Sequence, residues 1–445
     1  MTNAELLKRF YNAFDPTRPL AADDEAYVDY QDVRGDRNIL LEVGQGIILS
    51  DSPTCSLYAG HRGAGKSTEL LRLIPHLEDN GFQVVYFPAD AEDIDPEDAR
   101  YTDILLACTS RLLQELSPDD DNPVMRWLKD RWQSLKGLTT SEVALDDLTI
   151  EVFSTITANL RAVPSIRHQV RKLVDPHTVT LLQALNELID EANATQAGAS
   201  QSDIVLIADN LDRIVPITDT DSGRTNHDEI FLDRSEQLKA LHCHVVYTVP
   251  ISMVYSSSGT HLVDSYGPVR VLPMVTVRKR AQGKRVPGEG RPHEPGIAGL
   301  RELIQRRIGK VRPDIGLDQV FEDLDTLDHL CLMSGGHLRN LILLLRTSVE
   351  RAPHLPVPRL AMLRAISELR ETYNRTIADD EWVKLAEVYS RQTITNTDGC
   401  RKLLFNRCIL EYREMDDQQN VVTWYDIHPV IEDIPQFRRA LEEMP

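Results

Sequence analysis

The sequence predicts an α/β fold with a five-stranded parallel sheet, followed by a helical unit and a small unit of two helices and a hairpin. Three observations support this prediction. Short runs of β-branched and aromatic residues alternate with helical patterns in the first two thirds of the chain. A glycine-rich loop lies between the first run and a helix, and helical periodicity takes over beyond Pro273. The 445 residues suffice for about three domains.

Five strand-like runs are bounded by turn residues and are expected to form the sheet: Cys55–Ala59, Val84–Pro88, Ile204–Ala208, His244–Thr248 and Val269–Leu272. The crossover between the second and third runs, at about 101–200, is too long for one helix. Breaks at Ser117-Pro118, Gly137 and Val163-Pro164 predict that it holds several helices.

Beyond the sheet, helical periods cover Ile297–Arg307, Leu317–Met333 and Leu338–Arg351. Helices near Asp380–Arg391 and Asp398–Asn406 then precede strand-like runs at Cys408–Tyr412 and Val421–Tyr425, in the order of a winged-helix domain. We therefore expect an N-terminal helical or linker segment at 1–50, the α/β core at 51–277, a helical domain at 278–374 and a winged-helix-like domain at 375–445.

Composition excludes several classes of protein. The formal charge of −20 repels nucleic acid and anionic membranes, so any polyanion contact must be local. Apolar runs are too short to span a bilayer, and Met1–Phe14 lacks the apolar core of an export signal, which predicts a cytoplasmic protein without a membrane partner. The six cysteines are scattered, with no spacing typical of a zinc site or a disulfide framework.

The glycine-rich loop fits the phosphate-binding pattern G-x-x-x-x-G-K-[ST] in full. Its backbone N–H groups are expected to point at phosphate oxygens, with the positive end of a helix behind them. Lys66 would reach the β and γ phosphates of ATP, and Ser67 would bind Mg²⁺. The predicted nucleotide-binding residues are Gly60, His61, Arg62, Gly63, Ala64, Gly65, Lys66, Ser67 and Thr68.

A second set of polar residues follows the third and fourth strands. Asp209 ends the third strand, where Mg²⁺ needs a carboxylate ligand. The acidic residue that often follows such an aspartate is here Asn210, which can orient water but cannot take its proton. Asp212 is the best substitute, although an ion pair with Arg213 or a helix cap is equally compatible with the sequence. Turnover is therefore expected to be slow.

These motifs together resemble the core of the AAA+ and STAND P-loop ATPases. The run Asp209-Asn210-Leu211-Asp212-Arg213 is similar to the Asp-Asp-Leu-Asp-Arg of KAP-type NTPases and departs from it at Asn210. Thr248, at the end of the fourth strand, stands where these families carry their sensor-one residue. Gly335-Gly336-His337-Leu338-Arg339 resembles the start of their lid helix, which implies that Arg339 is a sensor-two residue that contacts the γ-phosphate.

Other positively charged residues are weaker candidates. Arg234 precedes the fourth strand, where AAA+ proteins often place an arginine finger that acts in a neighbouring subunit. Five cations fall within Arg278–Arg285, and a contact with a polyanion is one reading of them: Arg278, Lys279, Arg280, Lys284 and Arg285. A solvated loop is the plainer reading. Tyr27 or Tyr30 could stack on adenine, although core packing explains both residues as well.

The resemblance implies an Mg-ATP-dependent molecular switch, of a bacterial signalling or anti-phage defence type, that acts through self-assembly or a separately encoded effector. The alternative is a DNA-associated ATPase like origin-recognition or transposition-regulator proteins. Residues 376–445 contain eight Lys/Arg and fourteen Asp/Glu, and this acidic balance disfavours DNA. A near-inactive ATP-binding scaffold is a third reading, which Asn210 motivates.

Overall fold

The computed structural model describes residues 2–92, 94–116, 121–135, 149–196, 203–221, 223–256, 258–281, 283, 285 and 291–444. The predicted helix breaks at Ser117-Pro118 and Gly137 lie outside these residues. Among the described helices, none is both long and apolar enough to cross a membrane.

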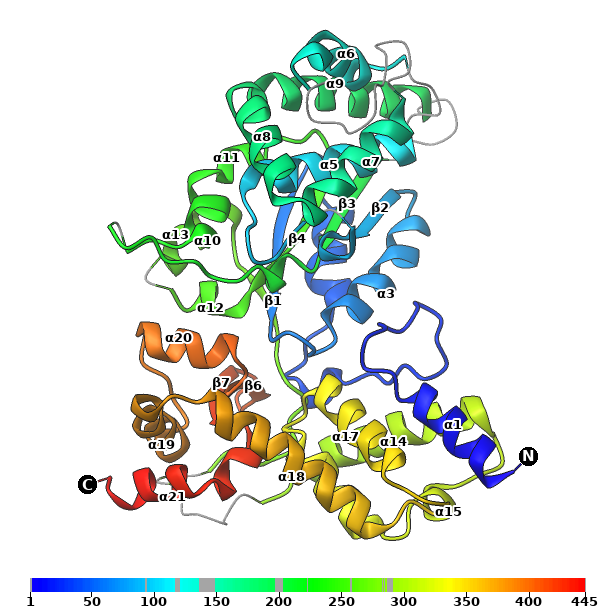
Figure 1. Ribbon diagram of the computed structural model, residues 1–445, viewed down its shortest axis with the longest axis vertical. Coiled ribbons are helices and arrows are strands. Elements are labelled where there is room, and N and C mark those ends of the chain that lie inside the picture. The colour runs from blue at the N-terminus through cyan, green and yellow to red at the C-terminus, as the bar shows by residue number, and fades with distance from the viewer. Residues whose placement is uncertain are drawn as a thin grey trace. The chain divides into compact units, whose positions relative to one another are not determined.

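A five-stranded sheet forms the centre of the α/β part (Figure 1). Its strands are β1 (Cys55–Gly60), β2 (Gln83–Pro88), β3 (Ile204–Asp209), β4 (His244–Pro250) and β5 (Arg270–Leu272), in the order β2-β3-β4-β1-β5. β3 runs parallel to β2 and β4, with Val85 opposite Leu206 and Ile207 opposite Val246. Both β3 and β4 are buried along their whole length, as their apolar sequences require. The predicted α/β fold with its parallel sheet is confirmed.

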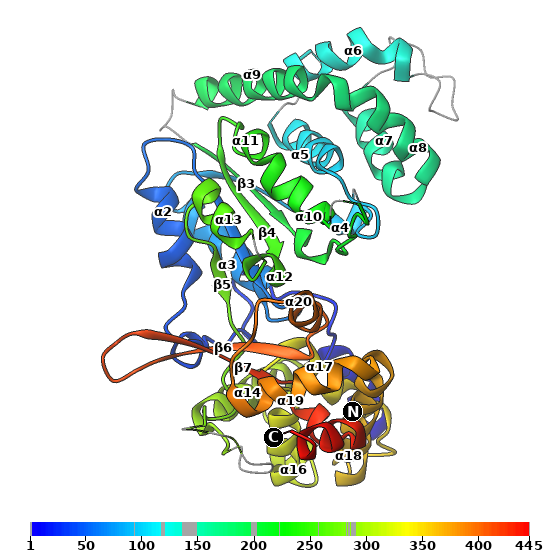
Figure 2. The ribbon, with the colours of Figure 1, turned by 90° about the vertical axis from the view of Figure 1, so that its left-hand side faces the viewer.

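Helices flank this sheet (Figure 2). The long crossover contains α5 (Tyr101–Leu116), α6 (Pro123–Leu135), α7 (Ile150–Ala162), α8 (Pro164–Val174) and α9 (Thr178–Gln196). α6 packs on α9, and α5 packs on both α7 and α9. The break predicted at Val163-Pro164 is confirmed, because α7 ends at Ala162 and Pro164 opens α8.

Shorter helices complete the α/β part. They are α2 (Gln45–Ile48), α3 (Lys66–Glu78), α4 (Ala89–Glu92), α10 (Asn226–Asp228), α11 (Ser235–Leu238), α12 (Ile251–Val254) and α13 (Gly259–Tyr266).

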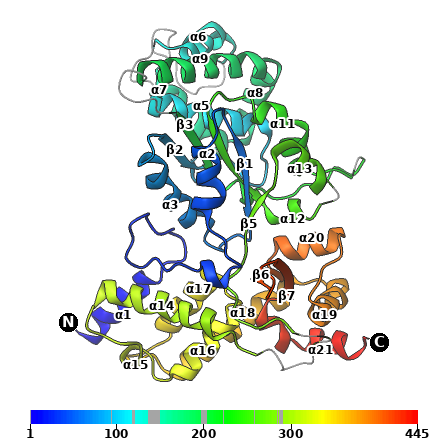
Figure 3. The same cartoon turned by 180° about the vertical axis from the view of Figure 1, so that it is seen from behind.

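The C-terminal part is mainly helical (Figure 3). It contains α14 (Glu294–Val311), α15 (Leu317–Val320), α16 (Leu324–Met333), α17 (Leu338–Glu350) and α18 (Arg359–Thr376), and α1 (Asn3–Ala13) packs on α14 and α17. The single helix predicted at Leu317–Met333 is wrong. Phe321 leaves the helix to pair with Val357, and the side chain of Asp323 caps a new helix by accepting from the Thr326 N–H at 3.2 Å.

Two helices, a hairpin and a last helix end the chain. They are α19 (Trp382–Arg391), α20 (Asp398–Phe405), the antiparallel strands β6 (Ile409–Met415) and β7 (Val421–Ile427), and α21 (Pro435–Glu442). Tyr412 and Trp424 lie opposite each other in the hairpin and stack with ring centroids 4.5 Å apart.

The contacts divide the chain into two compact units that are not contiguous in sequence. The first unit comprises Met1–Asn38, Gly60–Arg72 and Val271–Pro445, and the second comprises Ile39–Ala59 and Leu73–Arg270. This division differs from the contiguous domains that the sequence suggests, because the glycine-rich loop makes its contacts with C-terminal residues. The polar residues that follow β3 and β4 belong to the second unit.

Candidate functional site

The glycine-rich loop joins β1 to α3, and Lys66 is the first residue of the helix. The Lys66 side chain is 5% exposed, and its ammonium donates to the carbonyl oxygens of Gly60 at 2.8 Å and His61 at 3.0 Å. A buried ammonium group favours a nearby anion such as a phosphate. The loop therefore offers what a phosphate-binding site requires.

The start of α17 lies directly against this loop. His337 caps the helix, since its Nδ1 accepts from the Asn340 N–H at 3.0 Å, and its Nε2 lies 2.7 Å from the Arg62 carbonyl oxygen. This pairing requires a neutral imidazole with its proton on Nε2. Burial keeps the pKa of His337 well below its ordinary value, which agrees with that tautomer.

The backbone of α17 also holds the loop. The Arg339 N–H donates to the Gly63 carbonyl oxygen at 3.2 Å. Gly63 has φ of +93°, and a Cβ at this position would lie 2.6 Å from Cε1 of His337 and 2.9 Å from Cβ of Arg339. Only glycine allows both this backbone conformation and this close approach. The side chain of Arg339, the predicted sensor-two residue, is half-buried.

A second C-terminal element reaches the loop through His61. The Nε2 of this buried imidazole accepts from the Glu411 N–H of β6 at 3.0 Å. Burial, with a further contribution from the charge of Lys66, lowers the pKa of His61 to about 3. The Glu411 carboxylate is itself buried and accepts from Arg413 Nε at 2.8 Å. The loop is thus joined to α17 and to the hairpin by separate hydrogen bonds.

The N-terminal segment completes the surroundings of the loop. Arg34 is 2% exposed and donates from Nη2 to the Ala64 carbonyl oxygen at 2.6 Å. Sequence reasoning missed Arg34, although its place beside Gly35 in a segment expected near the nucleotide was a usable signal. Tyr27 and Tyr30, the residues that could stack on adenine, both make contacts within the protein: Arg72 lies 4.0 Å from the Tyr27 ring centroid, and Tyr30 donates to the Gly299 carbonyl oxygen at 3.3 Å.

The second unit holds Asp209 at the carboxyl end of β3. This carboxylate is fully buried, and its oxygens accept from the Asn210 N–H at 2.6 Å and from the Tyr86 hydroxyl at 2.9 Å. Burial, with the neighbouring Asp209 charge, raises the pKa of Tyr86, so its hydroxyl keeps the proton that it donates.

The turn after β3 has a constrained backbone. Asn210 has φ of +65°, in the left-handed region that asparagine tolerates better than most residues, and a 3₁₀ turn follows at Leu211–Arg213. Thr248 is fully buried at the end of β4, and its hydroxyl accepts from the Leu211 N–H at 2.9 Å. Asp212 is 5% exposed, and Arg213 pairs with Asp90 at 2.5 Å. Thr248 thereby sets the position of the turn that carries Asp212.

The remaining cations differ in their surroundings. Arg234 is exposed, and its guanidinium lies 5.7 Å from the Tyr101 ring centroid. The structure corrects the prediction of a polyanion contact for Arg278 and Arg285. Both are about 5% exposed, and they form ion pairs with Glu432 and Asp426. A cation buried against a carboxylate is not available to a second anion.

Of the other residues in the basic segment, Lys279 and Arg280 are exposed, and Arg280 lies 3.5 Å from Glu414. Lys284 lies outside the described residues.

No family model and no curated protein matches the chain. Several solved structures have a similar fold. The ORC2 protein of Aeropyrum pernix in its ADPNP-ADP complexes has 11% sequence identity and a TM-score of 0.42, and its alignment covers 97% of this chain and 96% of that chain. The Walker-type ATPase paby2304 of Pyrococcus abyssi has 14% sequence identity and a TM-score of 0.43. Its alignment covers 96% of this chain and 99% of that chain. The Aeropyrum pernix ORC1 protein in complex with DNA has 13% sequence identity and a TM-score of 0.37. Its alignment covers 98% of this chain and 96% of that chain. Sequence identities and TM-scores of this size do not assign the chain to a family.

Proposed function

We propose that the protein is an ATPase of the AAA+/STAND type that binds and hydrolyses Mg-ATP and works as a molecular switch. The observation that carries the proposal is the attachment of the phosphate loop to two separate C-terminal elements. His337 and Arg339 of α17 form hydrogen bonds with the loop, and His61 of the loop forms one with β6. A phosphate that shifts the loop backbone must also shift or break these hydrogen bonds. Nucleotide state is thereby passed to surfaces that a partner can read.

Each residue of the site receives a role under this proposal. Lys66 binds the β and γ phosphates, the backbone from Gly60 to Thr68 surrounds them, and Arg339 senses the terminal phosphate. Asp212, with Asn210 beside it, orients the attacking water, and Thr248 holds their turn in place. Arg234 is the candidate arginine finger of an oligomer, because its exposed position leaves it accessible to a second copy.

Ser67 and Asp209 are assigned to Mg²⁺. Hydroxyl and carboxylate oxygens are the hard donors that this cation prefers, so the chemistry of the two side chains fits Mg²⁺. When bound, the cation neutralises the charge that develops on the phosphates.

The switch is favoured over the DNA-associated alternative by charge. Arg278 and Arg285 form buried ion pairs, which leaves fewer of the five cations open to the polyanion contact that is one interpretation of this segment. The acidic balance of the C-terminal residues adds to this repulsion. We expect the output of the switch to be self-assembly or the engagement of a separately encoded effector, in the signalling or defence setting that the resemblance implies.

The test is steady-state ATP hydrolysis with and without duplex DNA, with the Lys66→Ala variant as the blank. A slow rate that DNA leaves unchanged, but that Lys66→Ala abolishes, supports the switch. Stimulation by DNA that is lost in a Lys279→Ala/Arg280→Ala variant supports the alternative. Hydrolysis equal to that of the blank refutes both ATPase proposals.

A further inference from the structure

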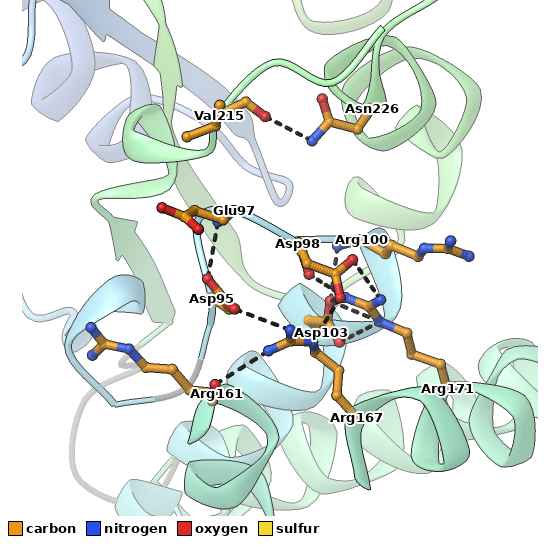
Figure 4. A network of polar contacts seen from close by, with 10 residues as sticks. All are labelled: Asp95, Glu97, Asp98, Arg100, Asp103, Arg161, Arg167, Arg171, Val215 and Asn226. Atoms are coloured by element: carbon orange, nitrogen blue, oxygen red, sulfur yellow. Dashed lines mark hydrogen bonds and ion pairs between the residues drawn. The ribbon is translucent and has the colours of Figure 1, made fainter. Parts of the chain in front are cut away.

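An ion-pair cluster joins the helical insertion, which is the crossover that contains α5 to α9, to the segment 94–100 that follows α4 (Figure 4). We call this segment, which contains Asp95 and Asp98, the aspartate loop. Arg167 and Arg171, one turn apart on α8, both point into this loop. Arg167 pairs with Asp95 at 3.0 Å and with Asp98 at 2.9 Å. Arg171 pairs with Asp98 at 2.9 Å and with Asp103, at the start of α5, at 2.5 Å. The two arginines thus bridge three aspartates.

The two arginines and Asp103 are withdrawn from water, whereas the Asp95 and Asp98 side chains are 27% and 46% exposed. The side chains of Arg167, Arg171 and Asp103 are 4%, 5% and 2% exposed. Burial raises the pKa of Asp103 despite the contact with Arg171, whereas the hydrogen bonds and charges of the two arginines outweigh burial at Asp98 and lower its pKa. Loss of an arginine would leave carboxylates close together and uncompensated, so the aspartate loop depends on both cations.

The same loop contacts the residues that follow β3. The Val215 N–H donates to the Pro96 carbonyl oxygen at 2.8 Å, and Pro96 lies between Asp95 and Asp98. Val215 is three residues beyond Asp212, and the Asn226 side chain donates to its carbonyl oxygen at 3.1 Å (Figure 4). The turn from Asn210 to Val215 is therefore held by Thr248 at one end and by the aspartate loop at the other.

We propose that Arg167 and Arg171 are positioning residues: through the aspartate loop they hold the turn that carries Asp212, so the helical insertion regulates nucleotide turnover. The inference rests on the proposed ATPase function. A ligand or partner that moves α8 changes the position of Asp212 without touching the nucleotide. The insertion then acts as an input element of the switch, distinct from the phosphate loop and its C-terminal contacts.

The structural coupling is tested first, without any use of activity, by hydrogen exchange of the Val215 amide. Arg167→Met should speed this exchange at least tenfold, since the Pro96 acceptor is no longer fixed. The Val245 amide, which donates to the Thr54 carbonyl oxygen at 2.7 Å, serves as an internal reference that stays unchanged. Lys172→Met is the matched control, because Lys172 is exposed on the same helix and carries the same charge. Equal Val215 exchange in both variants overturns the coupling.

Turnover is measured on the same variants. Arg167→Met should lower kcat at least fivefold with KM for ATP unchanged, whereas a merely structural defect lowers the number of active sites titrated by nucleotide and leaves kcat per site intact. If Arg167→Met folds poorly, the pair Arg171→Met/Asp103→Asn, which leaves no charge in the buried Arg171–Asp103 contact, replaces it. A kcat per site equal to that of the unsubstituted protein overturns the inference alone. Absence of hydrolysis in the unsubstituted protein overturns the proposed function instead.

Discussion

Replacement of His61 by glutamine should change the number of protons that the protein takes up when it unfolds in mild acid. His61 is buried beside Lys66 and accepts from the Glu411 N–H, so only its neutral form fits. A glutamine carbonyl oxygen can take the place of Nε2 as the acceptor, and it does not titrate. The His61→Gln variant thus removes the titration and keeps the hydrogen bond.

The size of the effect follows from the two pKa values. His61 has a pKa of about 3 in the folded protein and about 6.5 in the unfolded chain. At pH 5.5 the folded state holds almost no proton on His61, whereas the unfolded state holds about 0.9. The stability that neutral His61 provides is complete above pH 6.5 and is lost as the pH falls toward 3. Between pH 7.5 and 5.5 this loss amounts to about 1.4 kcal/mol.

The assay is proton uptake during urea unfolding at pH 5.5 in weakly buffered solution, followed with an indicator dye. His61→Gln should lower the uptake by about 0.9 proton per chain relative to the unsubstituted protein. At pH 8, where His61 is neutral in both the folded and the unfolded state, the two proteins should take up equal numbers of protons. Equal uptake by His61→Gln and the unsubstituted protein at pH 5.5 would show that His61 is already charged in the folded state, and the reasoning from burial would be refuted.

The remaining predictions concern the loop and the turn. Gly63→Ala should lower the unfolding free energy by about 1–3 kcal/mol more than Gly81→Ala. Both glycines have positive φ, but of the two only Gly63 has neighbouring atoms in the space that the new Cβ would take. Equal shifts of the melting temperature in the two variants would contradict this. Lys66→Ala should abolish ATP binding in a fluorescent-nucleotide titration. Retained affinity would show that the glycine-rich loop does not bind ATP through Lys66. Asp209→Ala should keep weak nucleotide binding but lose Mg²⁺-dependent turnover; turnover like that of the unsubstituted protein would place the metal carboxylate elsewhere. Asn210→Glu should raise kcat if a missing base limits the rate, at a cost of about 1 kcal/mol for the left-handed backbone, and an unchanged kcat would point to Asp212 or to a partner.

The sequence predicted the elements whose signals are local. All five strands lie where runs of β-branched and aromatic residues occur, since buried parallel strands require such runs. Pro164 marked the boundary between two helices because its ring fixes the first helical position. The helix expected at Leu317–Met333 failed for a local reason as well: the apolar spacing continues through Phe321, while Asp323 supplies a cap that periodicity alone does not weigh.

The contacts of the candidate site join residues far apart in the chain, and no periodic pattern of residues indicates them. The sequence motifs identified three polar candidates: Lys66 at the start of the helix after the glycine-rich loop, Asp209 at the end of β3 and Thr248 in β4. Nothing local indicates that His337 reaches the carbonyl oxygen of Arg62 or that Arg34 reaches that of Ala64. The basic segment shows the same limit, since the partners of Arg278 and Arg285 lie 154 and 141 residues downstream. Charge patterning counts cations but does not reveal which carboxylates fold against them.

The discontinuous first unit has a consequence for synthesis on the ribosome. The phosphate loop emerges early, but its hydrogen-bond partner on β6 lies 350 residues downstream of His61. At about 5–20 residues per second, translation takes roughly 20–70 s to add that partner. The loop therefore leaves the ribosome long before the C-terminal residues that form hydrogen bonds with it are translated. Under the proposed function, a nascent chain could bind phosphate at this loop before the contacts with α17 and β6 exist to respond to it.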